Sequence, residues 1–413
     1  MIKRLWLILL MMAVSIPALS AQETEDDTMT ESNMRYTYHQ ASGNRFVTGT
    51  GTFPNVTTQD ALVGDTPAWV IGNAGGWRVQ LVDQRVVNIR DDSVQASETP
   101  YEGVLALLSD DNFLIPDGMS LLSHPVLLPN VATLYITETG NLAAQVIGGT
   151  PIEIGLGIQL DARIVVSDDN RIAVYAGATN ERYVHGIMGD DIEGSEVVIL
   201  QIVDGAFEIL ERITLTGDAV YEGLSPMWAD VNGDGAQDLI TTVSDSQSGS
   251  RIRAYIFTDE GVQTVDGVPI GRGNRWQHQL VWASFAPDGT FELVEVLTPH
   301  IGGVVRFYQY QGDRLEIVAE LSGYTSHVIG SRNLDMAVAG DFNGDGIPEI
   351  VLPSQDRMTI AGIQRTETGA TVVWQLPLNA PVVTNLAAYE TETGLALATG
   401  LQSGVVRVWE SVE

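Results

Sequence analysis

The sequence contains no cysteine among its 413 residues. This absence excludes disulfide bonds, a thiol nucleophile, a thiolate zinc site and a cysteine-linked lipid anchor. Positive charge is also scarce, since 21 lysines and arginines stand against 53 aspartates and glutamates and leave a net charge of −32. Nucleic acids and anionic membrane surfaces are bound through basic patches, so we expect neither as a partner.

Two longer patterns are missing as well. After residue 22 no convincing amphipathic periodicity with helix caps is present, which argues against a helical domain. No segment beyond the N-terminus approaches the roughly 20 apolar residues that span a bilayer as a helix. The composition is otherwise globular, with 44% hydrophobic and 18% charged residues. We therefore expect a folded chain of strands and loops with a buried core.

The N-terminus has the pattern of a secretory signal peptide. Lys3 and Arg4 precede the apolar run Leu5–Ile16, and small residues follow at Ala18–Ala21. An uncleaved membrane anchor is the alternative, but the apolar run of about 12 residues is too short to span a bilayer. We predict a signal peptide at 1–21, an acidic flexible leader at 22–34, and a mature protein that is secreted or periplasmic without a membrane span.

A repeated unit fills the rest of the chain, and its features are clearest in the second half. One feature is a short apolar strand that ends in small residues. It is followed by a turn and a β-rich segment, and then by an alternating strand that carries an arginine. The apolar strands are Met227–Ala229, Val281–Ala283, Ala337–Ala339 and Asn385–Ala387, and the arginines are Arg253, Arg306 and Arg407.

The spacing of these features identifies the architecture. The three arginines are separated by about one and about two steps of roughly 50 residues, and this period with several short strands per unit is typical of β-propeller blades. We predict an all-β fold, a single β-propeller of about seven four-stranded blades over 35–413. The repeats are clearest at 222–270 and 332–378.

The first half of the repeat region is less regular. We expect blades around Ala61–Arg90, Leu105–Ile147 and Ile154–Thr214. The last unit shows only three strands before Glu413, yet the ring must close because an open sheet edge leaves N–H and C=O groups unpaired. We expect the N-terminal segment Arg35–Gly51 to supply the missing outer strand.

Two nine-residue loops carry the strongest chemical signal. Both have side-chain oxygens at positions 1, 3, 5 and 9, and glycine at position 6, which allows the positive φ of a sharp turn. Calcium binds six to eight oxygens, and the backbone carbonyl of position 7 can add to the set. We predict two structural calcium sites, with the ligands Asp230, Asn232, Asp234, Ala236 and Asp238 in one loop and Asp341, Asn343, Asp345, Ile347 and Glu349 in the other.

Two alternatives compete with this prediction. An EF-hand requires flanking helices and a glutamate at position 12, but position 12 is Thr241 or Leu352 and strand-like residues follow each loop. The other alternative is an ordinary turn rich in Asx and glycine that binds no metal. Equivalent turns near Ser284–Gly289, Val166–Asn170 and Tyr389–Gly394 lack the ligand set, and we assign no metal to them.

The pattern Asp-x-Asn-x-Asp-Gly-x-x-Asp followed by Leu-Ile resembles the calcium loop of the FG-GAP/VCBS repeat family, which includes the propeller of integrin alpha subunits. The close match covers two units of about 55 residues, around Asp230–Asp238 and Asp341–Glu349. This resemblance implies a secreted, bacterial-type β-propeller whose calcium loops join the first two strands of a blade.

Other chemical motifs are sparse, since the sequence has no nucleophile elbow, zincin motif or Walker loop. His300, His327 and Arg332 lie in adjacent predicted connections between strands, so they are candidates for a catalytic or ligand pocket near the central channel. The competing interpretation is that such polar residues satisfy buried backbone groups where blades meet the channel. His124 and His278 occupy similar positions before strands, which favours this structural role.

These observations predict a secreted, calcium-binding β-propeller that acts as a binding or scaffolding module for an extracytoplasmic protein or glycan. One alternative is an extracytoplasmic hydrolase or lyase with a site near His300 and His327 at the channel mouth. Another is a purely structural subunit of a larger secreted assembly. A deep pocket around the histidines favours the enzyme, whereas a face with exposed aromatic residues favours the binding module.

Overall fold

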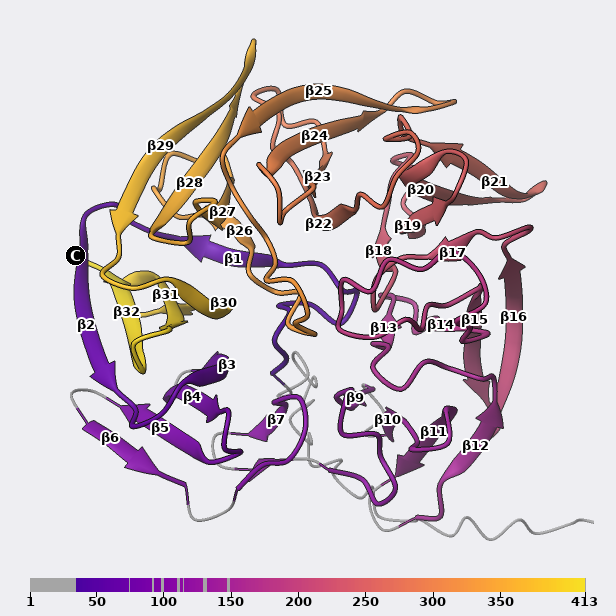
Figure 1. Ribbon diagram of the computed structural model, residues 1–413, viewed down its shortest axis with the longest axis horizontal. Coiled ribbons are helices and arrows are strands. Elements are labelled where there is room, and N and C mark those ends of the chain that lie inside the picture. Colours follow the sequence, from indigo (N-terminus) through magenta and orange to yellow (C-terminus); the bar gives the residue numbers. More distant parts are fainter. Residues whose placement is uncertain are drawn as a thin grey trace, which may run out of the picture.

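Seven sheets form a ring in the computed structural model (Figure 1), and each contains four antiparallel strands that make up a blade. The sheets of blades 4 and 6 carry one further strand each. The structure describes residues 35–412, apart from 74, 91–92, 98–99, 110–111, 114, 129–131 and 147–148, and the count of sheets refers to these residues. Within each sheet the strand order largely follows the chain. The prediction of an all-β propeller of about seven four-stranded blades is confirmed, whereas the predicted signal peptide and leader lie outside the described residues.

The first three blades take up the N-terminal half of the ring. Blade 1 contains β3 (Pro67–Asn73), β4 (Gly76–Leu81), β5 (Val86–Arg90) and β6 (Ser93–Ala96). Blade 2 contains β9 (Val126–Leu127), β10 (Ala132–Ile136), β11 (Asn141–Val146) and β12 (Ile152–Gly155). Blade 3 contains β13 (Val165–Val166), β14 (Ile172–Ala176), β15 (Glu196–Val203) and β16 (Ala206–Thr214). A small hairpin of β7 (Leu107–Ser109) and β8 (Asn112–Phe113) lies between blades 1 and 2 along the chain.

The remaining four blades are longer and more regular. Blade 4 contains β18 (Met227–Ala229), β19 (Asp238–Asp245), β20 (Gly249–Thr258) and β21 (Gly261–Asp266), with β17 (Val220–Tyr221) also paired to β19. Blade 5 contains β22 (Gln277–Ala283), β23 (Glu292–Leu297), β24 (Val304–Tyr310) and β25 (Leu315–Ser322). Blade 6 contains β26 (Val338–Asp341), β27 (Glu349–Pro353), β28 (Thr359–Thr366) and β29 (Gly369–Pro377). Blade 7 contains β30 (Val382–Thr391), β31 (Gly394–Leu401) and β32 (Val405–Ser411), together with β2 (Val56–Leu62).

The N-terminal segment closes the ring, but with a different strand from the one we expected. The outer strand of blade 7 is β2, which pairs antiparallel with β32 from Val56 to Leu62. The expected segment Arg35–Gly51 instead contains β1 (Phe46–Thr50), which pairs in parallel with β26 of blade 6. The chain therefore runs from the centre of the ring past blade 6 before it reaches the rim at blade 7 (Figure 1).

The expected blades of the first half are also displaced. Ala61 belongs to β2 rather than to blade 1, and Leu105 precedes the hairpin of β7 and β8 rather than opening blade 2. Ile154 lies in β12, the outer strand of blade 2, whereas blade 3 begins at Val165. These boundaries were wrong because β9 and β13 have two residues each, too few to show alternation.

The arginines of the third strands have a common partner. Each lies directly opposite an acidic residue on the outer strand of the same blade and forms an ion pair with it. The pairs are Arg253–Asp266, Arg306–Glu320 and Arg407–Asp60, with Nε to carboxylate distances of 2.6 Å in all three. The third pair joins β32 to β2, so the N-terminal strand fits the same cross-strand pattern as the outer strands within the chain.

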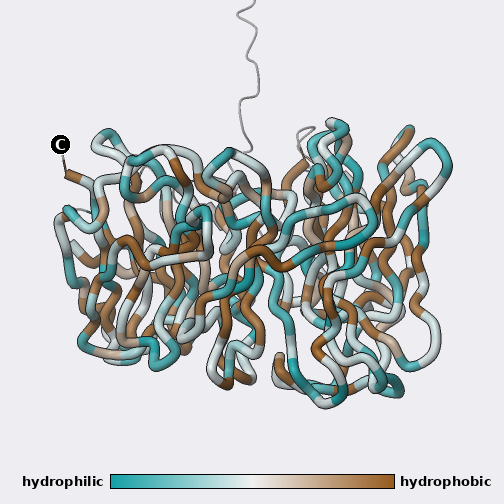
Figure 2. The backbone as a smooth tube through the Cα atoms, turned by 90° about the horizontal axis from the view of Figure 1, so that it is seen from above, coloured by the Kyte–Doolittle hydropathy of each residue, from teal (hydrophilic) through white to brown (hydrophobic). Residues whose placement is uncertain are grey.

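The hydrophobic core lies between neighbouring blades. Leu293 of blade 5 and Ile240 of blade 4, for example, belong to one hydrophobic cluster, and Trp409 of blade 7 and Trp374 of blade 6 belong to another. Seen edge-on, the molecule is a disc whose hydrophobic colour is concentrated between two more hydrophilic faces (Figure 2). No helix of the described residues is long and apolar enough to cross a membrane.

The segment Ala41–Arg45, here called the N-terminal hub, connects the inner strands of four successive blades. Its backbone carbonyls accept hydrogen bonds from the N–H groups of Val166 in β13 and Trp228 in β18, and from Ala339 in β26. Between these contacts, the Asn44 side chain bonds to both backbone groups of Trp282 in β22. The hub therefore acts as a central tie between blades 3, 4, 5 and 6.

A buried ion triad holds the hub beside the centre of the ring. Asp335 is fully buried and accepts hydrogen bonds from Arg45 at 2.9 Å and from Arg163 at 2.7 Å. Burial alone would raise the pKa of Asp335, but the two guanidinium groups outweigh this effect and hold the pKa below its usual value. The triad links the hub to the connections that precede blades 3 and 6.

Candidate functional site

Both predicted metal loops join the first strand of a blade to its second strand, as the family resemblance implies. Asp230–Asp238 connects β18 to β19 in blade 4, and Asp341–Glu349 connects β26 to β27 in blade 6. The glycines at position 6, Gly235 and Gly346, have φ values of 88° and 86°. The positive φ that we predicted for this position is therefore confirmed.

In the blade 4 loop, the carboxylate oxygens of the predicted ligands accept hydrogen bonds from backbone N–H groups of the same loop. Both carboxylate oxygens of Asp230 accept backbone N–H groups of the loop, at 2.8 Å from Gly233 and 3.0 Å from Gly235. Asp234 accepts the Ala236 N–H at 2.8 Å. Asp238 is fully buried and accepts N–H groups from the loop and from Phe257 in β20. Burial raises the pKa of Asp238 to about 6.

The blade 6 loop repeats this arrangement and adds two features. Glu349 is fully buried and one of its oxygens accepts the Phe342 N–H, but the other oxygen, Oε1, has no hydrogen-bond partner. Burial raises the pKa of Glu349 to about 8. The second feature is Gln364 of β28, whose amide Nε2 donates to both oxygens of Asp345, at 3.0 and 2.8 Å, and to the carbonyl of Ile347 at 3.2 Å.

The donor chemistry of these loops fits a hard cation. Within the described part of the chain, no three His, Asp or Glu side chains are gathered tightly enough to enclose a metal ion. Each carboxylate oxygen has lone pairs beyond those used by the loop N–H groups, so the same oxygens retain capacity for a cation. In the blade 6 loop, Glu349 Oε1 has no hydrogen-bond partner, and the Gln364 amide N–H groups donate to the Asp345 oxygens and the Ile347 carbonyl.

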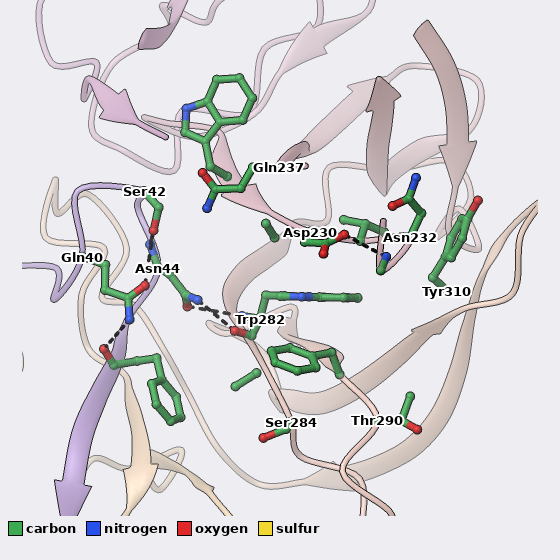
Figure 3. Close-up of a pocket in the computed structure, with 17 residues that line it drawn as sticks. Gln40, Ser42, Asn44, Asp230, Asn232, Gln237, Trp282, Ser284, Thr290 and Tyr310 are labelled. Atoms are coloured by element: carbon green, nitrogen blue, oxygen red, sulfur yellow. Dashed lines mark hydrogen bonds between the residues drawn. The ribbon is translucent and has the colours of Figure 1, made fainter. Parts of the chain in front are cut away.

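A cleft of about 600 Å³ lies beside the blade 4 loop, on the face that carries both metal loops. Figure 3 shows Trp282 in its middle, Asp230 and Asn232 on one side, and Ser284 and Thr290 on the other. We call it the blade 4–5 cleft. Its lining residues are Gln40, Ser42, Asn44, Phe46, Trp228, Ala229, Asp230, Val231, Asn232, Gly233, Gln237, Trp282, Ala283, Ser284, Thr290, Phe291 and Tyr310.

Several contacts fix the walls of this cleft. The Asn44 amide donates to the Trp282 carbonyl at 2.8 Å, and its oxygen accepts the Trp282 N–H at 3.3 Å. The rings of Trp282 and Phe291 are stacked with centroids 6.2 Å apart. On the opposite wall, the Arg171 guanidinium lies over the Trp228 ring at 4.6 Å. The cleft is therefore formed largely by side chains that are already held in place.

A second cleft, of about 740 Å³, lies on the other side of the hub. It shares Gln40, Ser42 and Phe46 with the blade 4–5 cleft and extends toward Asp168 and Glu390. Asp168 lies in the connection between the first two strands of blade 3, and Glu390 lies at the end of the first strand of blade 7. The metal-loop face is thus hollowed on both sides of the hub.

The structure brings His300 and His327 together, on the opposite face of the ring. Nε2 of His300 lies 2.6 Å from Nδ1 of His327, and Nε2 of His327 lies 2.6 Å from the Ser331 carbonyl. Since a carbonyl only accepts, His327 carries its proton on Nε2, and His300 donates to the free Nδ1. Burial lowers the pKa of His300 to about 4 and that of His327 to about 3, so both rings are neutral near pH 7.

Arg332 does not join this pair. Its guanidinium forms ion pairs with Asp161 at 2.8 Å and Asp190 at 2.5 Å. These pairs tie the approach to blade 6 to the connection before blade 3 and to the connection between β14 and β15. His278 lies near the histidines, stacks on Trp276 at 4.3 Å and bonds to Ser326. This packing supports the structural role that the sequence offered as the competing interpretation.

Several residues of these sites were not singled out by sequence reasoning. Nδ1 of His185 lies 2.5 Å from a carboxylate oxygen of the buried Glu222, and Gln364 reaches the blade 6 loop from another strand. The aromatic wall of the cleft was also missed, although Trp282 and Phe291 flank the degenerate turn at Ser284–Gly289. The turn itself could have indicated the cleft, because it lacks the metal ligands found at the equivalent place in blades 4 and 6, and Ser284 at its start lines the cleft.

The four-stranded blades, their closure by the N-terminal strand and the axial hub define the class of protein as a β-propeller. A solved structure described as the Dos1 propeller is similar, with 9% sequence identity over 88% of this chain and 95% of that chain and a TM-score of 0.41. No model of a known protein family matches the sequence. No curated protein matches it either.

Proposed function

We propose that this β-propeller is a secreted or periplasmic calcium-binding module that holds a protein or glycan ligand on its metal-loop face. The observation that carries this proposal is the blade 4–5 cleft, which lies against one of the two predicted metal loops and is lined by aromatic rings. Loops on a rigid ring are suited to recognition because their positions are fixed by the blades beneath them.

Calcium is supported by the ligand chemistry of the loops. The predicted ligands are Asp230, Asn232, Asp234, Ala236 and Asp238 in blade 4 and Asp341, Asn343, Asp345, Ile347 and Glu349 in blade 6. A cation at each loop would offset three clustered carboxylates and supply a partner for Glu349 Oε1. The same nine-residue pattern supports the proposal that the chain is related to the FG-GAP/VCBS repeat family.

The extracytoplasmic location is supported by the N-terminal pattern of Lys3, Arg4 and the apolar run Leu5–Ile16. It is compatible with the absence of cysteine, which leaves no thiol to be oxidised outside the cytoplasm. Extracellular calcium modules tolerate weak affinities because the ion is abundant there. The location is tested by expressing the full chain and determining the N-terminal residue of the exported product, which we expect at Ala21 or Gln22.

Thermal unfolding of residues 22–413 with calcium and with excess chelator tests the metal. We expect calcium to raise the melting temperature, because an ion that binds only the folded state stabilises it by mass action. Asp234→Ala and Asp345→Ala should each lower the melting temperature in calcium and reduce its calcium-dependent part. If both variants melt like the wild type with and without calcium, the loops are ordinary turns and the metal proposal is wrong.

The alternative is an extracytoplasmic hydrolase or lyase that uses the His300–His327 pair. The short contact between the two rings favours it. However, three of the four ring nitrogens are engaged with each other or with Ser331, and both large clefts described above lie on the other face. The geometry therefore supports the binding module better than the enzyme.

A further inference from the structure

We propose that the blade 4–5 cleft binds a neutral saccharide chain. This inference rests on the proposed function, because it names the ligand class of the same binding face. The argument comes from the size of the cleft, the charge of its lining and the pairing of aromatic rings with uncharged polar groups.

The size of the cleft favours a small extended ligand. Its volume of about 600 Å³ lies within the range of roughly 300–1,000 Å³ that is typical of small-molecule sites. A protein partner would instead need about 800 Å² of surface on each side, most of it outside such a hollow. A chain of a few sugar units fills a cleft of this volume and continues beyond its open ends.

The lining has the wrong charge for an anionic ligand. No lysine, arginine or histidine is among the lining residues and Asp230 is acidic, while Arg171, which covers the Trp228 ring, is paired with Asp169. The whole chain carries a net charge of −32, which repels anions at longer range. Phosphorylated ligands and acidic polysaccharides are therefore disfavoured relative to neutral ones.

The uncharged polar groups suit the hydroxyl groups of a sugar. Amides and hydroxyls donate and accept hydrogen bonds without requiring charge on the ligand, as sugar hydroxyls also do. They converge on the cleft from the N-terminal hub region, from the blade 4 loop and from the turn of blade 5 (Figure 3). The uncharged polar residues that are at least partly exposed are Gln40, Asn232, Gln237, Ser284 and Thr290, whereas Ser42 and Asn44 are buried and belong to the hub.

Aromatic rings supply the apolar contact that a sugar ring requires. Phe291 is 53% exposed although it stacks on the buried Trp282. Tyr310 flanks the same cleft from β24 and is half-buried. Stacking on Trp282 already restricts the Phe291 side chain, so this side chain loses little conformational entropy when a ligand binds. Phe291 and Tyr310 are therefore the residues we expect to contact the sugar faces.

The experiment is isothermal titration of residues 22–413 in calcium with cellohexaose, mannohexaose, xylohexaose and chitohexaose, and with hexagalacturonate as the acidic probe. We expect at least one neutral chain to bind and hexagalacturonate to bind none or far less. Phe291→Ala and Tyr310→Ala should each weaken binding on the order of tenfold. Because Tyr310 packs against the core between blades 4 and 5 and Phe291 stacks on Trp282, binding is measured well below the melting temperature of each variant. Ile301→Ala is the matched control, because Ile301 is 81% exposed on the histidine face and should leave binding unchanged.

Three results would overturn the inference: no binding of any neutral chain, preference for hexagalacturonate, or neutral binding that survives both aromatic substitutions. Each of these is independent of the calcium-dependent melting temperature. A protein that is stabilised by calcium but binds no saccharide retains the proposed metal sites and loses only this ligand class. A protein that calcium does not stabilise, yet that binds a neutral chain through Phe291, loses the metal proposal and retains the cleft.

Discussion

At the scale of single residues, a group of buried charged side chains determines where the N-terminal hub lies. Asp335 carries two guanidinium partners, Arg45 and Arg163, and all three side chains are buried. A buried pair contributes little net stability over an apolar pair, but removing one partner leaves charge without compensation. The triad therefore fixes where the N-terminal hub lies more than it adds to overall stability.

Replacing Asp335 tests this argument. Asp335→Ala leaves two buried guanidinium groups without a carboxylate and should lower the free energy of unfolding by about 3–5 kcal/mol. Chemical denaturation at neutral pH measures the change. The control is Asp313→Ala, because Asp313 forms an exposed pair with Arg314 and should change stability by less than about 1 kcal/mol. Equal effects of the two substitutions would contradict the proposed role of the triad.

The two metal loops also differ at a single residue, because Gln364 forms hydrogen bonds with the blade 6 loop. Its amide reaches the predicted ligands at positions 5 and 7 of the blade 6 loop, whereas the blade 4 loop receives the Phe257 backbone N–H on Asp238. Because an amide rotates to present either its nitrogen or its oxygen, Gln364 is able to add an oxygen ligand in the presence of a cation.

We expect Gln364→Leu, in an Asp234→Ala background that leaves the blade 6 loop intact, to weaken calcium affinity on the order of tenfold. Calcium titration followed by melting temperature measures this loss. Gln309→Leu is the control, because Gln309 lies on the third strand of blade 5, whose equivalent loop lacks the ligand set. If both leucine variants retain the same calcium affinity, Gln364 is not a ligand.

At the scale of elements, the N-terminal strands complete two blades that are formed mainly by the other end of the chain. β2 supplies the outer edge of blade 7, and β1 adds to the inner edge of blade 6. Without β2, β32 would be an exposed edge with unpaired backbone groups. The Arg407–Asp60 pair shows that this closure also repeats the side-chain pattern of the other blades.

Deletion tests the contribution of these elements. Removal of residues 22–34 should leave the melting temperature unchanged, because that acidic leader has too few apolar residues to form a core. Removal of 22–62 deletes the hub, β1 and β2, and should abolish the cooperative unfolding transition. The transition is followed by circular dichroism and intrinsic tryptophan fluorescence. A cooperative transition after the longer deletion would show that blades 6 and 7 do not require these strands.

Much of this element pattern could be predicted from the sequence, and the remainder could not for a physical reason. The third strands of blades 4, 5 and 7 carry the arginine that pairs with the outer strand, so the period of these blades is visible. β2 was missed because its residues are mostly exposed and its partner lies at the other end of the chain. The cleft was missed because it combines residues near 40, 230 and 290, which only the closed ring brings together.

At the scale of the whole molecule, buried histidines link stability to pH. Burial lowers the pKa of His327 to about 3 and that of His278 below its usual value, so both are neutral in the folded protein. In the unfolded chain they take up a proton near pH 6.5. The unfolded state therefore binds more protons below that pH, and the stability contributed by burying these rings falls as the pH drops from about 6.5 toward 4.

The free energy of unfolding should accordingly decline by about 1.4 kcal/mol per pH unit for each such histidine, once the pH is well below 6.5. Urea denaturation between pH 4 and pH 8 measures the slope. His327→Asn removes one titrating ring, so it should make the slope shallower whatever its effect at neutral pH. The same slope in the variant and the wild type would mean that His327 does not contribute.

The N-terminal hub and β2 have a consequence for the time at which the protein is able to fold. Residues 41–62 are synthesised long before their partners, which include β26 in blade 6 and β32, which ends at Ser411. The closed ring therefore cannot form until the ribosome has passed Ser411. If the protein is exported as proposed, the ring would stay open during translocation and would close only after β32 had crossed the membrane.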